Sequence, residues 1–393
     1  MAIGATKPRS LSLLLVGAAV CAALLLISLA PTGASAREIS KRVAGTRVSL
    51  STAKAVGGQS AKKTGKKVRS GAGGGPIYWG AWIGEQFTGA QAPWDMGAVS
   101  SFEKVADKSL SLVNFSSPFA ACSGSSCSYY KFPTAPMENV RQHGAIPFFS
   151  WASQASPSSL NQPEFQLADV ADGNFDSYIR QFATEAKAWG HPFFLRFNWE
   201  MNGNWFPWSE GVNGNGPGTY VAAWRHVHDI FASVGATNAT WVWCPNIDPG
   251  HKLHDLASLY PGDEYVDWTC LDGYNWGPSP YHPEKWKSFG DLFGSTYDTI
   301  TEQIAPSKPM IIGETGCNEA GGSKAEWIKD MLREIPSEFP KIRGVQWFEK
   351  NEEGEWPIES SESSATAFSA GIQNQDYVGS DFGSISGTIQ PPS

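Results

Sequence analysis

The feature that most limits the fold is a regular alternation of short apolar runs and helical patterns, which begins at Pro76 and continues to about residue 375. The runs are continuously apolar, as expected of strands that are buried on both faces. We predict strands at residues 77–82, 110–115, 145–151, 193–199, 240–245, 269–274, 310–314 and 344–348.

Helical periodicity fills the intervals between these strands. Apolar residues from Phe175 to Trp189 and from Tyr220 to Val234 recur every three or four positions, and Gly190 and Gly235 follow as C-terminal caps. Weaker helical patterns cover residues 96–108, 134–143, 289–304, 324–335 and 360–373. Alternating strands and helices imply a parallel sheet with right-handed crossovers, and eight such units favour a closed (β/α)8 TIM barrel of the α/β class. The alternative, a doubly wound open sheet, lacks a Gly-rich dinucleotide or phosphate loop to support it.

The N-terminal region has the composition of a targeting segment. Lys7 and Arg9 precede an apolar run, and Ala34-Ser35-Ala36 offers a cleavage site, so we expect a signal peptide over residues 1–36. An uncleaved membrane anchor is the alternative, because the run is long enough to span a bilayer. We therefore expect a secreted, extracellular protein without obligatory membrane contact after cleavage.

Residues 37–75 carry ten basic residues and one acidic residue, without apolar periodicity. Such a segment cannot bury enough apolar area to order itself, so we interpret it as a disordered basic linker or pro-segment. Association with an acidic cell wall is a further option.

Residues 76–375 are the predicted catalytic domain, and residues 376–393 a C-terminal tail. The net charge of −8 argues against a nucleic-acid partner, and we expect a monomer.

Five cysteines remain after the leader, so at least one is left without a partner in the same chain. Cys122 and Cys127 flank a short Gly/Ser loop, and we predict that they form a disulfide. The pairing of Cys244, Cys270 and Cys317 is left open, and their spacing does not resemble a zinc site. The histidines form no metal-binding pattern either, so we expect neither a metal nor a cofactor.

Two carboxylates follow apolar strands on opposite sides of the predicted barrel. Glu200 ends the fourth strand within a segment rich in Trp and Asn, and Glu314 follows the seventh strand between glycines. Active sites of such barrels lie where the strands end. A pair of acids in an aromatic-lined cleft suits glycosidic bond cleavage, with one acid protonated and the other ionised. Glu200, between Trp199 and Trp205, fits the acid, and Glu314 fits the nucleophile with Tyr274 as a hydrogen-bond donor.

The segment Arg196-x-x-x-Glu200-Met201-Asn202-Gly203-x-Trp205-x-x-Trp208, with the later Gly313-Glu314-Thr315-Gly316, resembles glycoside hydrolase family 26. The resemblance covers about residues 76–375. It implies a retaining endo-glycosidase on a (β/α)8 barrel, with Glu200 as acid/base, Glu314 as nucleophile and a β-linked polysaccharide as substrate. It also implies that Tyr274 orients the nucleophile, with Asp272 as a polar contact nearby.

Several aromatic residues are candidates for sugar binding. The resemblance implies that Trp205 and Trp347 are stacking platforms. The other candidates for substrate binding are Arg196, Asp272, Tyr274, Trp199, Trp208, Trp79, Trp151 and Trp243. Aromatic faces stack on the apolar faces of sugar rings, but each of these tryptophans also suits a core.

The resemblance leaves the polymer open. Many family members have His immediately before the acid/base, where this chain has Trp199, and an indole offers one donor and no acceptor. We expect an endo-β-1,4-mannanase, with a β-1,3-1,4-glucanase or β-1,3-xylanase as alternatives of the same class. An alternative of another class is a non-catalytic carbohydrate-binding protein, which would have no use for both carboxylates.

Overall fold

The structure is a computed structural model of the 393-residue chain that describes residues 74–247, 255–280, 283–379 and 382–393. The predicted signal peptide and residues 37–73 of the basic segment lie outside the described residues. Within the described ranges, no helix combines the length and apolar character needed to cross a membrane.

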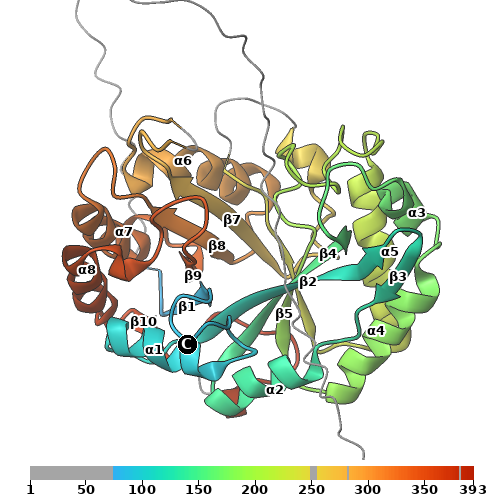
Figure 1. The fold of residues 1–393 in the computed structure, drawn as a ribbon, viewed down its shortest axis with the longest axis horizontal. Helices are drawn as coiled ribbons and strands as arrows, with labels where there is room; N and C mark the ends of the chain where they lie inside the picture. Colours follow the sequence, from blue (N-terminus) through green and yellow to red (C-terminus); the bar gives the residue numbers. More distant parts are fainter. Residues whose placement is uncertain (1–73, 248–254, 281–282, 380–381) are drawn as a thin grey trace, which may run out of the picture. The chain divides into compact units, whose positions relative to one another are not determined.

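Eight parallel strands form the centre of the fold (Figure 1). Each confirms one of the strands predicted from the apolar runs, and most of their side chains are buried. The strands are β1 (Ile77–Ile83), β2 (Leu112–Ser123), β4 (Ile146–Ser156), β5 (Phe193–Phe197), β6 (Ala239–Trp243), β7 (Trp268–Asn275), β8 (Met310–Cys317) and β9 (Ile342–Glu349).

The sheet closes into a barrel where β1 pairs with β2. This contact has only two register pairs, Gly80 with Leu112 and Ala81 with Val113. On the same edge of β1, Ile77 and Tyr78 pair with β10 (Tyr377–Val378). On β2, the residues from Ala120 onward pair with β3 (Ser126–Tyr129). A Cβ atom on Gly80 would lie 2.1 Å from the carbonyl oxygen of Leu112, so the closing contact requires glycine at this position.

Helices surround the strands, as Figure 1 shows, and their apolar faces pack on the outside of the barrel. This arrangement confirms the (β/α)8 fold expected from the alternation. The α-helices in the described residues are α1 (Met96–Ala106), α2 (Thr134–His143), α3 (Leu167–Ala171), α4 (Asp176–Trp189), α5 (Thr219–Val234), α6 (Phe289–Thr299), α7 (Lys324–Glu338) and α8 (Glu362–Ile372).

The β2–β3 hairpin extends β2 well beyond its predicted end. A disulfide joins Cys122 and Cys127 across the two strands, at the position expected from the sequence. The hairpin was not predicted because its residues are short, polar and largely exposed, so they give no apolar signal.

The C-terminal residues do not form a separate tail. Tyr377 and Val378 add β10 to the sheet, and Ile389 is fully buried. The backbone N–H of Ile389 donates to Thr240, and the indole of Trp268 donates to the Ile389 carbonyl, so this segment packs where β6 and β7 begin. This contact was not predicted because Ile389 is a single apolar residue in a Gly/Ser/Pro-rich stretch.

Candidate active site

Glu200 and Glu314 lie at the ends of β5 and β8 that carry the active site in barrels of this kind. Both carboxylates are almost completely buried, with 6% and 5% of their surface exposed. They are close enough for the negative charge of Glu314 to raise the pKa of Glu200. The two acids predicted from the sequence therefore belong to one site.

Each oxygen of Glu200 accepts a hydrogen bond. Asn246, in the segment after β6, donates its amide to Oε1 at 2.6 Å, and the Trp205 indole donates to Oε2 at 2.6 Å. Burial, followed by the charge of Glu314, raises the pKa of Glu200 from 4.5 to about 7, against the opposing effects of these hydrogen bonds and of Arg196. A carboxyl group with such a pKa can hold a proton near neutral pH and release it to a leaving group.

The backbone that carries Glu200 adopts an uncommon conformation. Asn198 and Glu200 have φ angles of 45° and 52°, in the left-handed region that non-glycine residues rarely occupy. Two hydrogen bonds of 2.8 Å join the side chain of Asn198 to Ser153, and the N–H of Glu200 donates to the Cys244 carbonyl at 2.7 Å. These contacts hold a strained turn that places the carboxylate.

Glu314 accepts hydrogen bonds from a buried arginine and a partly buried tyrosine. Arg196 donates through Nη2 to Oε1, and Tyr274 donates to Oε2 at 2.5 Å. Burial, together with the nearby carboxylates, raises the pKa of Tyr274 well above 10, so its hydroxyl remains a donor. The predicted hydrogen bond from Tyr274 to Glu314 is thus present.

Arg196 is fully buried and fixes a second carboxylate. It donates to Asp272 at 2.8 Å through Nη1 and to Ser150 at 2.8 Å through Nε. Asp272 is fully buried as well, so neither residue can touch a polysaccharide in this structure. Their predicted role as substrate-binding residues is wrong. Instead Asp272 binds Arg196, and Arg196 donates to Glu314 and fixes its position.

Gly313 leaves the space that this cluster needs. A Cβ atom at position 313 would lie 2.6 Å from Oδ1 of Asp272, 2.6 Å from Sγ of Cys270 and 3.1 Å from Nη1 of Arg196. The ladder between β7 and β8 is irregular here, so that Asp272 pairs with Glu314. The glycine allows the backbone of β8 to approach the cluster directly.

A second disulfide lies beside the buried arginine. The structure joins Cys244 to Cys270 and leaves Cys317 as a buried thiol, which resolves the pairing that the sequence left open. Cys244, Cys270 and Asp272 are also a group of potential metal ligands within 4.8 Å of one another. While Cys244 and Cys270 are joined in the disulfide, neither has a thiolate to bind a metal, and Asp272 is already bound to Arg196. This group therefore does not form a metal site in the disulfide form.

The tryptophans predicted to bind substrate divide into one exposed residue and several buried ones. Trp205 is 42% exposed and remains a candidate for stacking on a sugar. Trp199 is mostly buried, and its ring lies 4.9 Å from the Arg196 guanidinium. Trp208 is fully buried and donates to the Trp199 carbonyl, so it supports this segment and cannot contact a sugar.

Four other tryptophans predicted to bind substrate pack against the outer layer instead, which corrects that prediction. Their side chains are at most 2% exposed and contact helix or loop residues behind the barrel strands. The five ring contacts are Trp79 with Phe102 and with Phe368, Trp151 with Phe182, Trp243 with Tyr260, and Trp347 with Phe368.

Other aromatic residues, not identified from the sequence, occupy the positions near the acids. Phe348 lies next to Trp347 on the opposite face of β9, and its ring is 5.5 Å from that of Tyr274. Trp82 packs 5.9 Å from Phe348 and 6.0 Å from the Arg196 guanidinium. Alternation places each of them on the face opposite its outward-facing neighbours, but the apolar sequence does not show which face is the inner one. Asn246 gave no comparable signal.

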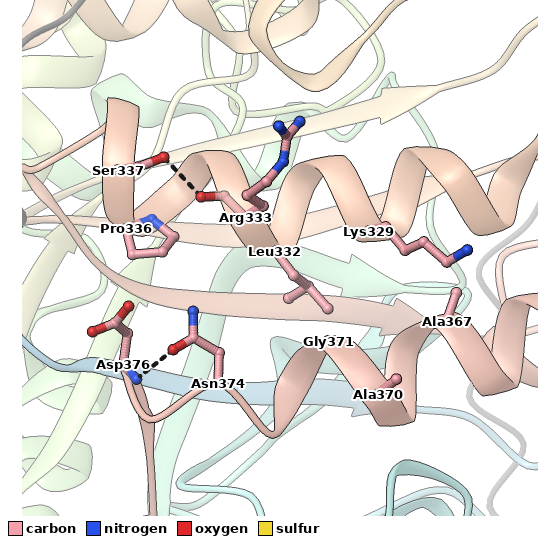
Figure 2. A pocket seen from close by; sticks show the side chains of 10 residues that line it. All are labelled: Lys329, Leu332, Arg333, Pro336, Ser337, Ala367, Ala370, Gly371, Asn374 and Asp376. Atoms are coloured by element: carbon pink, nitrogen blue, oxygen red, sulfur yellow. Dashed lines mark hydrogen bonds between the residues drawn. The ribbon is translucent and has the colours of Figure 1, made fainter.

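A groove on the outer surface is separate from this site. It encloses about 570 Å³ between α7 and α8 (Figure 2). Leu332 and Ala367 contribute apolar surface, and Lys329 and Arg333 extend from α7 beside it. Arg333 is already paired with Asp330. The groove holds neither of the two acids, and we assign no chemistry to it.

Comparisons with known proteins agree with the geometry. The sequence model described as "Glycosyl hydrolase family 26" matches residues 59–298. The chain is 33% identical to Endoglucanase H of Acetivibrio thermocellus over 299 residues, which is 75% of this chain and 30% of that protein. It is 28% identical to "Mannan endo-1,4-beta-mannosidase A and B" of Caldalkalibacillus mannanilyticus over 169 residues, covering 40% of this chain and 29% of that protein. The chain thus spans less than a third of the length of both relatives.

Solved structures support the fold. Bacillus subtilis mannanase man26 aligns with a TM-score of 0.54 at 16% identity, covering 78% of this chain and 87% of that one. A double mutant of the Cellulomonas fimi endo-beta-1,4-mannanase aligns with a TM-score of 0.57 at 16% identity, covering 80% and 73%. At such identities the likeness concerns the barrel and not the substrate.

Proposed function

Because the chain belongs to glycosyl hydrolase family 26, we propose that it is a retaining endo-β-glycosidase with Glu200 as acid/base and Glu314 as nucleophile. The observation that carries this proposal is the contrast between the two buried acids. Glu200 has a pKa of about 7, whereas Glu314 receives hydrogen bonds from a buried arginine and a tyrosine. One acid can therefore give up a proton while the other is held ready to attack.

In the first step Glu314 attacks the anomeric carbon, and the bond from that carbon to the leaving oxygen breaks. The proton of Glu200 passes to the leaving oxygen, so the departing sugar leaves as a neutral alcohol. Tyr274 and Arg196 fix the attacking carboxylate, which limits the motion needed to reach the carbon.

In the second step Glu200, now ionised, removes a proton from water. The water oxygen attacks the anomeric carbon, and the bond to Glu314 breaks, which restores both carboxyl groups. Loss of the negative charge on Glu314 in the intermediate lowers the pKa of Glu200, because that charge helps to raise it. The shift favours the base form of Glu200 in the step that needs a base.

For the substrate we propose a β-linked hexose polymer, with β-1,4-mannan as the first candidate. The names of the mannosidase relatives support mannan. A β-glucan is the second candidate, since the relative that is 33% identical is called an endoglucanase. Trp199 stands where many family members have His and has no acceptor to offer a sugar hydroxyl, which leaves room for glucan or another hexose polymer.

A substrate panel tests the activity and the polymer together. Galactomannan, glucomannan, barley β-glucan, cellulose and β-1,3-xylan would be incubated with the wild type, with Glu200→Ala and Glu314→Ala, and with Glu326→Gln as a surface control. We expect new reducing ends from mannan or glucan only with the wild type and the control. Binding without new reducing ends on every polymer would instead favour a carbohydrate-binding protein.

Azide separates the roles of the two acids. On a 2,4-dinitrophenyl β-glycoside, whose leaving group needs no proton, azide should rescue Glu200→Ala and give a β-glycosyl azide. Azide should also rescue Glu314→Ala, but with an α-glycosyl azide as product, because it attacks the substrate directly. The reverse stereochemistry would exchange the two assignments.

We also propose that the protein is exported, with residues 1–36 removed before Arg37, and that it acts as a monomer. The composition of the leader supports export. Sequencing the N-terminus of protein recovered from the culture medium would test cleavage. Sedimentation of the purified enzyme would test the oligomeric state.

A further inference from the structure

Lys324 is a buried lysine that donates no hydrogen bond to Glu200 or Glu314 in the described structure but lies elsewhere in the same barrel. Only 1% of its surface is exposed, and it is the first residue of α7, where the helix dipole disfavours a positive charge. A charge in this position is costly unless several acceptors surround it. Its ammonium group donates to Ser360 Oγ at 2.8 Å and to three consecutive carbonyls, those of Glu355 at 2.5 Å, Trp356 at 3.0 Å and Pro357 at 2.8 Å.

These acceptors belong to residues 355–360, which connect β9 to α8 and carry the buried indole of Trp356. That indole packs against two residues near Glu314, which are Gly316 and Tyr274. Its ring would lie 3.0 Å from a Cβ atom on Gly316, two residues after Glu314 in β8, and its ring centroid is 5.1 Å from that of Tyr274. Tyr274 in turn donates to Glu314.

We propose that Lys324 is a positioning residue for the nucleophile, and that its ammonium group holds residues 355–360 so that Trp356 braces Tyr274 and β8. The inference rests on the proposed function, in which Glu314 attacks the sugar. Lys324 itself contacts neither acid through a hydrogen bond in the described structure. Its effect passes through the backbone of the segment and the ring of Trp356.

The charge of Lys324 is part of this arrangement. Burial lowers its pKa from 10.5 to about 8, against the opposing effects of Glu319, Glu349, Cys317 and Glu355, which face it from β8, β9 and the adjoining loops. Above this pH a neutral amine has two N–H donors for four acceptors, so the hold on the segment weakens. The pKa of Glu349 is itself raised by burial, so its titration must be separated from that of Lys324.

Loss of the charge should not unfold the protein. Between about pH 8 and 10.5 the unfolded chain retains a proton on this lysine that the folded protein has released. Folding stability contributed by this group therefore rises with pH in that range. A decline in activity above pH 8 without a decline in stability is what a positioning role predicts, and a purely structural role predicts no such separation.

The test uses Lys324→Met, Lys324→Arg and the matched control Lys329→Met, an exposed lysine on the same helix. The substrate is a 2,4-dinitrophenyl β-disaccharide of the sugar identified by the polymer panel. Its leaving group needs no proton, which removes the contribution of Glu200 to the alkaline side of the kcat/KM profile. We expect kcat/KM to fall at least tenfold in Lys324→Met, and less than threefold in Lys324→Arg and in the control.

The pH profiles decide between positioning and stability. In the wild type, kcat/KM should fall as pH rises through about 8 while the melting temperature does not. This decline should be absent from Lys324→Arg, which stays charged, and should persist in Glu349→Gln. The wild-type and Lys324→Arg profiles suffice even if Lys324→Met does not fold.

Three results would overturn the inference: a wild-type profile that stays flat to pH 9, a decline that persists in Lys324→Arg, or a decline lost only in Glu349→Gln. If the wild type cleaves no substrate, or cleaves without needing Glu200 and Glu314, the proposed function fails instead. The two failures can thus be told apart.

Discussion

Replacing Glu200 by Gln should make the protein more stable at neutral pH, and the gain should depend on pH. The pKa of Glu200 rises from 4.5 to about 7 in the folded protein, chiefly through burial. Each pKa unit corresponds to about 1.36 kcal/mol, so ionising the buried group costs about 3 kcal/mol more in the folded protein than in the unfolded chain.

The sign follows from proton binding. Between pH 4.5 and about 7 the folded protein retains a proton that the unfolded chain has lost, so the free energy of unfolding falls as pH rises. Gln cannot ionise and is free of this loss. From about pH 4 to pH 8, the free energy of unfolding of Glu200→Gln minus that of the wild type should therefore rise by about 3 kcal/mol.

Urea unfolding followed by circular dichroism at several pH values would measure this difference. Glu326→Gln is the control, because the Glu326 side chain is 66% exposed and the difference for this variant should stay flat. A flat difference for Glu200→Gln as well would refute the reasoning. It would mean that the carboxyl group ionises as easily in the folded protein as in water, and could not serve as a neutral-pH acid.

Further predictions concern the proposed nucleophile, two tryptophans and Gly313. Tyr274→Phe removes a hydrogen bond to Glu314 worth about 1.5–3 kcal/mol, so kcat/KM should fall about 10- to 100-fold in steady-state assays. Trp205→Ala should raise KM for long substrates and change the free energy of unfolding by less than about 1 kcal/mol, whereas Trp151→Ala should cost about 3–5 kcal/mol in urea unfolding. Gly313→Ala should cost about 1–3 kcal/mol and most of the activity, because the added Cβ meets buried polar atoms; wild-type activity in this variant would contradict the geometry.

The barrel could be predicted because its strands give a strong and simple signal. Runs such as Phe193–Phe197 are apolar throughout, and amphipathic helices such as α5 separate them. The β2–β3 hairpin and the burial of Ile389 could not be predicted in this way. Their stability comes from a disulfide and from contacts with distant strands, which local periodicity does not record.

The sequence pattern revealed the two acids but misplaced most of the aromatic residues. A carboxylate at the end of an apolar strand is conspicuous, since burial there needs a partner. Continuous apolar strands, however, carry no alternation to show which side faces the substrate. Trp347 and Phe348 read alike in the sequence, yet Trp347 packs against α8 and Phe348 faces Tyr274.

Lys324 could not have been singled out, because a lysine beginning an amphipathic helix usually lies in solvent. Only the fold brings three carbonyls and a hydroxyl around its ammonium group. Its burial at the positive end of α7 departs from local preference, and such departures are expected near functional sites.

Because β1 and β2 share only a short pairing, closure of the barrel depends on the absence of a Cβ atom at Gly80. If a side chain at Gly80 pushed these strands apart, backbone donors and acceptors on both would lose their partners. Exposed strands of this kind recruit strands from other molecules. Damage at this contact should thus show first as aggregation of the protein at high concentration.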